Sequence, residues 1–186
     1  VADVCAAPGG KTAQLAAGGA RVIVLDISKK RLTLVRDNMR RLGLDADCRL
    51  GDARAVDSAE RFEAILLDAP CSGTATIRPH PHIARLKTAG DVARLAQTQT
   101  AMLDAAAAAL APGGTLVYAV CSVFDSEGRG VVERFVRARQ LDRDMRGWRP
   151  QVILGEHLLH LRRRAPEISG ELHFLVADLG DAGERA

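Results

Sequence analysis

Apolar residues occur along the chain in short runs that are separated by longer, mixed stretches. A short apolar run bounded by polar residues is typical of a strand buried on both faces of a sheet. Runs of this kind, some of them interrupted, predict strands at 1–5, 21–26, 46–50, 63–68, 115–121 and 171–177. Helical patterns lie between them, at about 11–17, 28–42, 91–110 and 127–139. This alternation predicts an α/β fold with an open, parallel sheet.

Residues that favour helix ends mark the limits of two of these helices. Ser28 is placed to cap the second helix, and Gly43 is placed to end it. The segment Pro112-Gly113-Gly114 follows an alanine-rich stretch and should stop the long third helix. The pattern alone gives about six strands.

Length and hydrophobicity indicate one domain. The chain has 186 residues, 47% of them hydrophobic, which is enough for a core of ordinary size. We place the domain at 1–179 and expect 180–186 to be a frayed tail. Because the chain opens within a strand and has no initiator Met, we expect that the start of this strand and an upstream region are missing.

Charge and cysteine content narrow the class of protein. A formal net charge of +3 permits a polyanionic partner, while 3% aromatic residues are too few for a base-stacking platform. None of the four cysteines has C-x-x-C spacing, so we expect neither a zinc knuckle nor disulfides. No apolar span is long enough for a membrane helix, and we expect a cytoplasmic monomer without a metal.

Candidate ligand-binding residues follow the predicted strands directly. In open α/β sheets, ligands bind beyond the carboxyl ends of the strands. The first strand leads into a turn with two glycines, Cys5–Thr12, and three later strands end at Asp26, Asp52 and Asp68. The turn fits neither the G-x-G-x-x-G fingerprint of nicotinamide enzymes nor a Walker A loop. One carboxylate at a strand end can be a helix cap, but three in succession indicate a binding site.

Three motifs resemble those of one enzyme family. They are D-V-C-A-A-P-G-G-K-T at 3–12, L-D-A-P-C-S-G-T at 67–74 and Y-A-V-C-S-V at 118–123. In sequence, order and spacing they are similar to the Nol/Nop/Sun (RsmB-like) RNA cytosine-5 methyltransferases, which use S-adenosylmethionine. The resemblance runs from Val1 to about Arg139 and then weakens. It implies a class I methyltransferase (Rossmann-like) fold, doubly wound, with a mostly parallel seven-stranded sheet and one reversed strand.

The same resemblance implies where the cofactor binds. Asp26 would hold the ribose hydroxyls and Asp52 would sit at the adenine. Asp68 would lie near both the cofactor amine and the target base. The methionine end would be wrapped by the turn that contains Cys5, Ala6, Ala7, Pro8, Gly9, Gly10 and Lys11.

Two cysteines have a chemical purpose in this family. Carbon 5 of cytosine is a poor nucleophile, and attack of a thiolate on carbon 6 makes it able to take a methyl group. The resemblance assigns this attack to Cys121 and release of the product to Cys71. Asp68 could stabilise the adduct by hydrogen bonding to ring nitrogen 3. The pKa of Cys121 should be lowered, with Lys11 and the basic loop as candidate causes.

Cysteines outside these two roles have a simpler interpretation. A cysteine at a strand end is usually a small buried hydrophobe. Cys48 lies in no motif and should be one. Cys5 should be mostly the same, although its backbone adjoins the cofactor loop.

The loop I-R-P-H-P-H-I at 77–83 departs from the family pattern. The residues Ala75 or Thr76, Pro79 and His82 are unusual for the family. The sequence L-H-F-L at 172–175, in the last predicted strand, is unusual as well. The H-P-H spacing is compatible with metal ligands but has no acidic or Cys partner nearby, so we expect no metal. Arg78 and His80 are expected to reach RNA phosphate or the base. The basic C-terminal third is either an RNA contact or solvated surface.

The sequence therefore predicts methylation of carbon 5 of a cytosine in RNA. The resemblance implies bacterial small-subunit rRNA as the substrate and an N-terminal RNA-binding domain, NusB-like in many members. Two rivals remain open. One is a non-catalytic RNA-binding or ribosome-assembly factor that retains the cofactor fold, and the other is a nicotinamide-dependent Rossmann enzyme.

Overall fold

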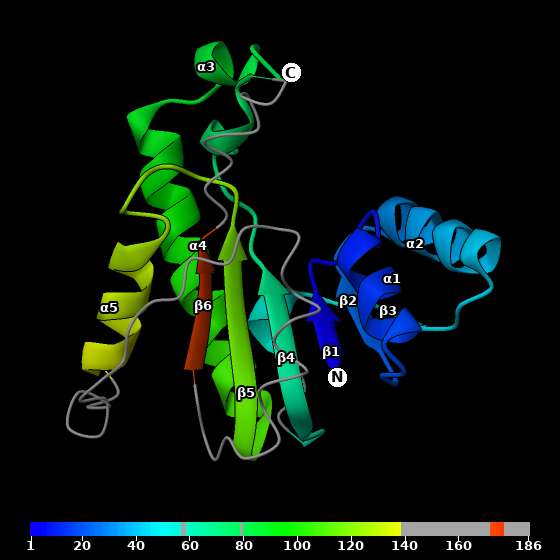
Figure 1. Cartoon of the computed structure of the whole chain (residues 1–186). Coiled ribbons are helices and arrows are strands. Elements are labelled where there is room, and N and C mark those ends of the chain that lie inside the picture. Colours follow the sequence, from blue (N-terminus) through cyan, green and yellow to red (C-terminus); the bar gives the residue numbers. More distant parts are fainter. Residues whose placement is uncertain (57–58, 79, 139–171, 177–186) are drawn as a thin grey trace, which may run out of the picture.

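A six-stranded sheet forms the centre of the molecule (Figure 1). This computed structural model describes residues 1–56, 59–78, 80–138 and 172–176. The strand order is β3-β2-β1-β4-β5-β6, and every pair of neighbours is parallel. The strands are β1 (Ala2–Val4), β2 (Ile23–Asp26), β3 (Asp47–Leu50), β4 (Phe62–Asp68), β5 (Leu110–Val120) and β6 (Leu172–Val176). Reversal of the order at β1 and β4 makes the sheet doubly wound.

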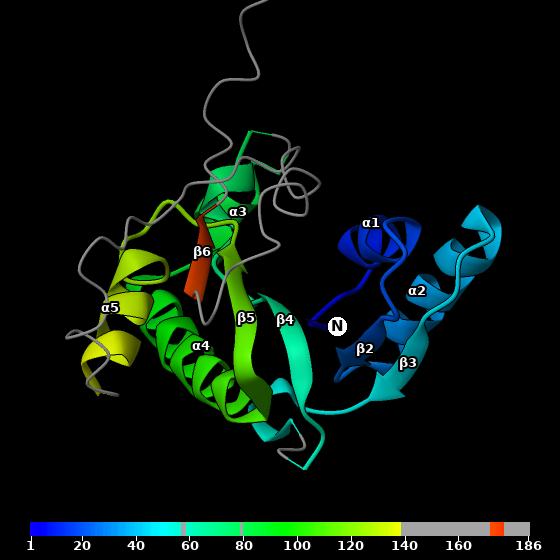
Figure 2. The same ribbon diagram turned by 60° about the horizontal axis from the view of Figure 1, so that its bottom comes forward.

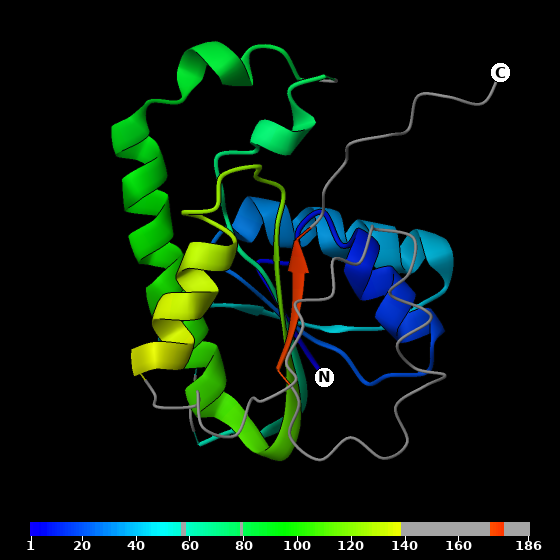
Figure 3. The same cartoon turned by 60° about the vertical axis from the view of Figure 1, so that its left-hand side comes forward.

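Helices cover both faces of the sheet. The longer ones are α1 (Gly10–Ala17), α2 (Lys29–Leu42), α4 (Ala89–Ala109) and α5 (Arg129–Ala138). Figure 3 shows α1 and α2 on one side of the sheet and α4 and α5 on the other. A short helix, α3 (Ile83–Leu86), lies beyond the arrow tips of β5 and β6 (Figures 1 and 2). The 3₁₀ turns η1 (Ala53–Ala55) and η2 (Thr74–Thr76) follow β3 and β4.

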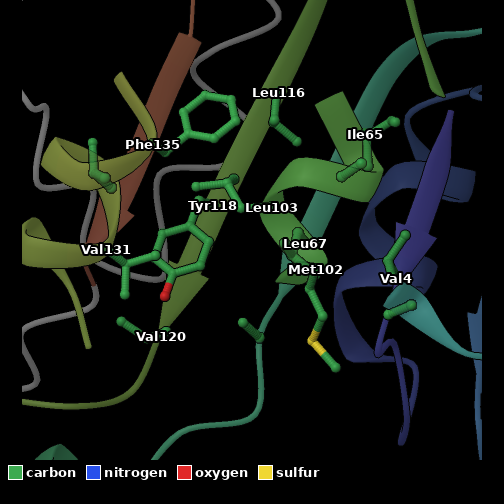
Figure 4. Close-up of a cluster of buried hydrophobic side chains, with 14 of the residues drawn as sticks. Val4, Ile65, Leu67, Met102, Leu103, Leu116, Tyr118, Val120, Val131 and Phe135 are labelled. Atoms are coloured by element: carbon green, nitrogen blue, oxygen red, sulfur yellow. The ribbon is translucent and has the colours of Figure 1, made fainter. Parts of the chain in front are cut away.

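The two faces have separate cores. The larger core packs α4 and α5 against β4 and β5, and Figure 4 shows Tyr118 and Leu103 at its centre. The smaller core packs α2 against β2 through Leu32, Val35 and Val24. The apolar runs contribute to both cores, and β4 is mostly buried as predicted, but the edge strand β3 is only partly buried, with Leu50 exposed.

The predicted caps of α2 are confirmed. The Ser28 side chain accepts a hydrogen bond from the backbone N–H of Arg31, and Gly43 has the left-handed conformation, with φ 65°. A helix that ends in this conformation satisfies its last carbonyl groups at a residue that needs no Cβ. The boundaries of α2 therefore follow from local sequence.

The long helix α4 ends at Ala109, close to the expected end at about 110, but the expected start of the next strand at 115 is wrong. Strand β5 begins directly after the helix, at Leu110, so Pro112-Gly113-Gly114 lies within this strand and not before it. The register between β4 and β5 then shifts, because Phe62 pairs with Leu110 while Ala64 pairs with Thr115. The Pro-Gly-Gly segment lies in this irregularity, which is where a sheet tolerates proline and glycine.

Other differences concern the strand count and the third part of the chain. The described residues contain six strands and no reversed one, so the seventh strand implied by the resemblance is not among them. Helix α5 begins at Arg129, two residues later than expected. Most of the basic C-terminal third, and the tail at 180–186, lie outside the described residues. No helix in the described part is long and apolar enough to cross a membrane.

Candidate active site

A pocket of about 380 Å³ lies at the carboxyl ends of the first four strands. The predicted residues Cys5, Asp26, Asp52 and Asp68 all line it. The remaining lining residues are Leu25, Ile27, Arg31, Gly51, Ala53, Arg54, Pro70, Thr98 and Met102. The volume suits a small ligand, and its position is where open α/β sheets bind one.

The glycine turn connects β1 to α1 on one side of the pocket. Cys5 has φ 63° and Gly9 has φ 99°, so two residues of this turn have a left-handed backbone conformation. A Cβ on Gly9 would come within 3.0 Å of the Val35 side chain, and glycine is therefore required there for close packing as well as for conformation. Of the turn, Cys5 lines the pocket, while Ala6 is buried in the smaller core. The others, Ala7, Pro8, Gly9, Gly10 and Lys11, form the bend and the first turn of α1.

Asp26 is almost fully buried at the end of β2. Its Oδ1 accepts a hydrogen bond of 2.9 Å from the Ser28 backbone N–H. Its Oδ2 lies 3.2 Å from the Arg31 guanidinium without hydrogen-bond geometry. Arg31 also donates to the Ala7 carbonyl, at 3.2 Å, which ties α2 to the glycine turn. Asp26 Oδ2 thus keeps a lone pair for a ligand in the pocket.

Asp52 is more exposed and has a strong partner. Arg54 donates to both of its carboxylate oxygens, with Nη2 2.6 Å from Oδ2. These hydrogen bonds, with one from the Arg54 backbone N–H, lower the pKa of Asp52 below its usual range. Arg54 is half-exposed, so this pair is accessible to solvent at the pocket mouth.

Asp68 forms an ion pair with Lys11. The Lys11 Nζ lies 2.6 Å from Asp68 Oδ2, and both side chains are about one third exposed. The pair joins the glycine turn to the end of β4. Asp68 also lines the pocket, and Asp68 and Lys11 act in opposite directions on the pKa of Cys121.

Cys71 and Cys121 lie side by side although 50 residues separate them in sequence. Their Sγ atoms are 3.2 Å apart, and the Cys121 backbone N–H points at Cys71 Sγ at the same distance. Pairing of Asp68 with Ala119 in the parallel register brings the segments after β4 and β5 together. Both side chains are half-buried.

The close contact shifts the pKa values of the two thiols in opposite directions. The hydrogen bond from Cys71 lowers the pKa of Cys121 to about 7, against the opposing effect of burial. Lys11, one of the two candidate causes, contributes to this lowering, but the hydrogen bond from the neighbouring thiol has the largest effect. The same hydrogen bond, with burial, raises the pKa of Cys71 far above its usual range. Cys121 is thus the thiol that ionises near neutral pH.

Within the described part of the chain, no thiol hydrogen bond is formed by the other two cysteines. Burial, above all, raises the pKa of Cys5 to about 12. Cys48 is half-buried against the smaller core, with burial also raising its pKa. Both therefore fit the interpretation as small hydrophobic residues, and Cys5 also lines the pocket.

The predicted RNA-contacting residues do not belong to the pocket. Arg78 and His80 are exposed in the loop after η2, and the His80 ring packs edge-on against His82 with centroids 5.8 Å apart. The described residues contain no group of three or more potential metal ligands.

Sequence reasoning did not identify the nine remaining lining residues as part of the site, and four of these have polar or long side chains: Arg31, Arg54, Thr98 and Met102. Arg31 and Arg54 each follow a predicted acid by a few residues, which is a local signal that could have been used. Thr98 and Met102 come from α4 and have no local signal, because only packing of α4 brings them to the pocket.

Comparisons with known proteins agree with this geometry. A family model described as 16S rRNA methyltransferase RsmB/F matches residues 1–179. Ribosomal RNA small subunit methyltransferase B of Salmonella newport strain SL254 is 46% identical over 142 residues, 74% of this chain and 33% of the relative. The chain thus spans about a third of the length of the curated relatives it matches.

Solved structures give the same result. NSun6 from Pyrococcus horikoshii, determined with SFG, superposes with a TM-score of 0.68 at 30% identity. The match covers 82% of this chain and 39% of that one. A methyltransferase homolog protein from Pyrococcus horikoshii gives a TM-score of 0.63 at 31% identity, covering 74% and 44% of the two chains.

Proposed function

Because the chain belongs to the RsmB/F family of 16S rRNA methyltransferases, we propose that it methylates carbon 5 of a cytosine in small-subunit rRNA. The predicted family and the class I methyltransferase fold are both confirmed. The observation that supports methylation at carbon 5 of cytosine is the pair of thiols 3.2 Å apart, of which one has a pKa of about 7. A non-catalytic assembly factor would have no use for such a pair.

S-adenosylmethionine is the cofactor of this family, and it supplies a methyl group on a sulfonium. The pocket fits such a molecule. The Oδ2 atom of Asp26 is buried and accepts no hydrogen bond from the residues that the structure describes, which suits a ribose hydroxyl donor. Asp52 lies at the pocket mouth, where it would face the adenine, and the glycine turn would border the methionine end. We therefore propose that Asp26, Asp52 and the turn Cys5–Lys11 bind the cofactor.

Cys121 would form the covalent bond to the base. Its thiolate attacks carbon 6, and the electron pair moves to carbon 5, which takes the methyl group. The proton on carbon 5 then leaves, the bond between Cys121 and carbon 6 breaks, and the thiolate is regenerated. Asp68 lines the pocket and acts electrostatically on Cys121, and it would hydrogen-bond the ring during attack.

Cys71 would take part in release, and its contacts give a reason for the order of events. The largest influence that raises its pKa is the hydrogen bond with Cys121, and the charge of Cys121 adds to it. Once Cys121 is bonded to carbon 6, both influences disappear. Cys71 then loses its proton more readily and can accept the proton from carbon 5, directly or through water.

Two variants test this proposal in the presence of S-adenosylmethionine and 16S rRNA. Cys121→Ala should transfer no methyl group and form no covalent adduct. Cys71→Ala should attack and methylate once, then stall as a protein–RNA crosslink that survives a denaturing gel. The double variant should behave like Cys121→Ala, and Cys48→Ala serves as the control with near-normal turnover.

Three results would contradict the proposal. A crosslink that forms in Cys121→Ala but never in Cys71→Ala would reverse the two roles. Full activity in both variants would exclude covalent catalysis. Binding of S-adenosylmethionine without methyl transfer by the unaltered protein would favour the assembly-factor alternative.

A further inference from the structure

Glu127 is a fully buried acidic residue behind the two thiols. It lies just before α5, and none of the motifs above contains it. Its Oε1 accepts hydrogen bonds from the Ser72 backbone N–H at 2.8 Å and from Gln99 Nε2 at 3.2 Å. Its Oε2 accepts from the hydroxyl groups of Ser72 at 2.5 Å and Ser122 at 2.6 Å.

The partners of Glu127 are neutral donors. No ion pair is formed by Glu127 within the described part of the chain. A buried carboxylate without a cation is costly unless hydrogen bonds to it are nearly complete. Four donors converge on this one, and they come from three separate segments. Such an arrangement fixes the relative positions of these segments more than it adds to stability.

Two of these segments carry the thiols. Ser72 directly follows Cys71, and Ser122 directly follows Cys121. Their hydroxyl groups are 3.1 Å apart, and Thr74 Oγ1 lies 3.2 Å from Ser122 Oγ. Gln99 of α4 also donates to the Pro70 carbonyl at 2.9 Å, on the other side of Cys71.

We propose that Glu127 is a positioning residue: by holding Ser72 and Ser122 on one carboxylate, it sets the spacing and direction of the Cys71 and Cys121 side chains. This inference rests on the proposed function for its effect on methyl transfer, but the spacing itself can be tested without RNA. Because the low pKa of Cys121 depends first on its hydrogen bond with Cys71, any loosening of the pair should weaken that effect.

The sign of the effect separates positioning from direct electrostatics. Glu127 is not among the groups that shift the pKa of Cys121. Removal of a nearby negative charge would by itself lower the pKa of a thiol. Loss of the Cys71 hydrogen bond would raise it. An upward shift in a Glu127 variant can therefore come only through a change in position.

The experiment compares Glu127→Gln with Glu133→Gln, which alters an exposed residue of α5 whose neighbour is Arg137. Iodoacetamide labels the chain across a range of pH, and peptide mass analysis gives the rate at Cys121 alone. The unaltered protein and Glu133→Gln should show a midpoint near pH 7. In Glu127→Gln the midpoint should rise by about 0.7 pH unit or more, and labelling at pH 7 should be slower by about threefold or more, because the thiolate fraction at pH 7 falls from about one half to about one sixth.

Methyl transfer provides a second measurement. In Glu127→Gln the single-turnover rate should fall about tenfold or more, because small misplacement of a nucleophile slows attack. The affinity for S-adenosylmethionine, measured by calorimetry, should not change, since Glu127 does not line the pocket. If Glu127→Gln does not fold, Ser122→Ala removes a single hydrogen bond to the carboxylate and should show the same direction of change.

A folded variant whose labelling profile matches that of the unaltered protein would overturn the proposal. A purely structural role would give that result together with a lower unfolding temperature. If the unaltered protein transferred no methyl group to cytosine, the proposed function would fail. The labelling experiment would still decide the role of Glu127.

Discussion

The cofactor pocket and the thiol pair hold their functional groups in opposite ways. In the pocket, Asp26, Asp52 and Asp68 each pair with a partly exposed cation. Such ion pairs are weak and can rearrange when a ligand binds. Behind the thiols, buried neutral donors converge on Glu127. The difference suits their tasks, because the pocket has to exchange its ligand whereas the thiols have to keep their spacing.

Asp3 is as deeply buried as Glu127, but its carboxylate accepts a hydrogen bond from one donor among the described residues. It lies in β1 and accepts a hydrogen bond of 2.6 Å from Thr12, while its Oδ1 has no hydrogen-bond partner among the described residues. Burial raises the pKa of Asp3 to about 7. The folded protein therefore keeps this proton at pH values where the unfolded chain has lost it.

We expect the largest effect from Asp3→Asn. Between pH 4 and pH 7 the unfolded state binds fewer protons at this site, so the free energy of unfolding falls as pH rises. The span of about three pH units corresponds to at most about 4 kcal/mol. Asp3→Asn lacks this contribution, and its stability relative to the unaltered protein should increase from pH 4 to pH 7.

Urea unfolding at several pH values measures this difference. A constant offset between the two proteins over the whole range would show that Asp3 titrates normally in the folded state. Asp37→Asn, on the exposed side of α2, provides the matched control and should follow the unaltered protein.

The second largest effect is expected when a donor is removed from the buried hydrogen bonds behind the thiols. Gln99→Leu removes the donor to the Pro70 carbonyl and one donor to Glu127, while its size is nearly conserved. Since a buried acceptor left without a donor costs about 1–3 kcal/mol, the free energy of unfolding should fall by about 2–3 kcal/mol. Gln97→Leu, on the exposed side of α4, should change it by less than about 0.5 kcal/mol. Equal effects of the two variants would mean that the buried network adds nothing.

The smallest effect concerns the pocket. Asp26→Asn should weaken binding of S-adenosylmethionine by about 2 kcal/mol, or roughly thirtyfold, because a buried charged acceptor is lost. Asp52→Asn should cost about 1 kcal/mol or less, since Asp52 is more exposed and better screened. Calorimetry on both variants compares them directly, and a larger loss for Asp52→Asn would invert the assignment of the two acids.

Local patterns predicted the fold well because they act over a few residues. Apolar runs form β2, β4 and β5. Helix α2 is capped by Ser28 at its start and by Gly43 at its end, as expected. The start of β5 was predicted too late because Pro112-Gly113-Gly114 fits a β-bulge as well as a loop. Only pairing with β4 places these residues inside the strand.

The candidate site was predictable only in part. The sequence determined which residue types follow each strand, and parallel strands bring their carboxyl ends to one edge. The positions of Asp26, Asp52 and Asp68 at one pocket therefore followed from the pattern.

Tertiary structure alone decided how the reactive groups interact. The register of β4 and β5 places Cys71 and Cys121 at 3.2 Å across 50 residues of chain, and their contact gives them different acidities. The role of Glu127 depends on the same register, because its donors come from α4 and from two loops. A hydrogen bond has a reach of about 3 Å, and the sequence contains no local signal for such a distance between remote segments.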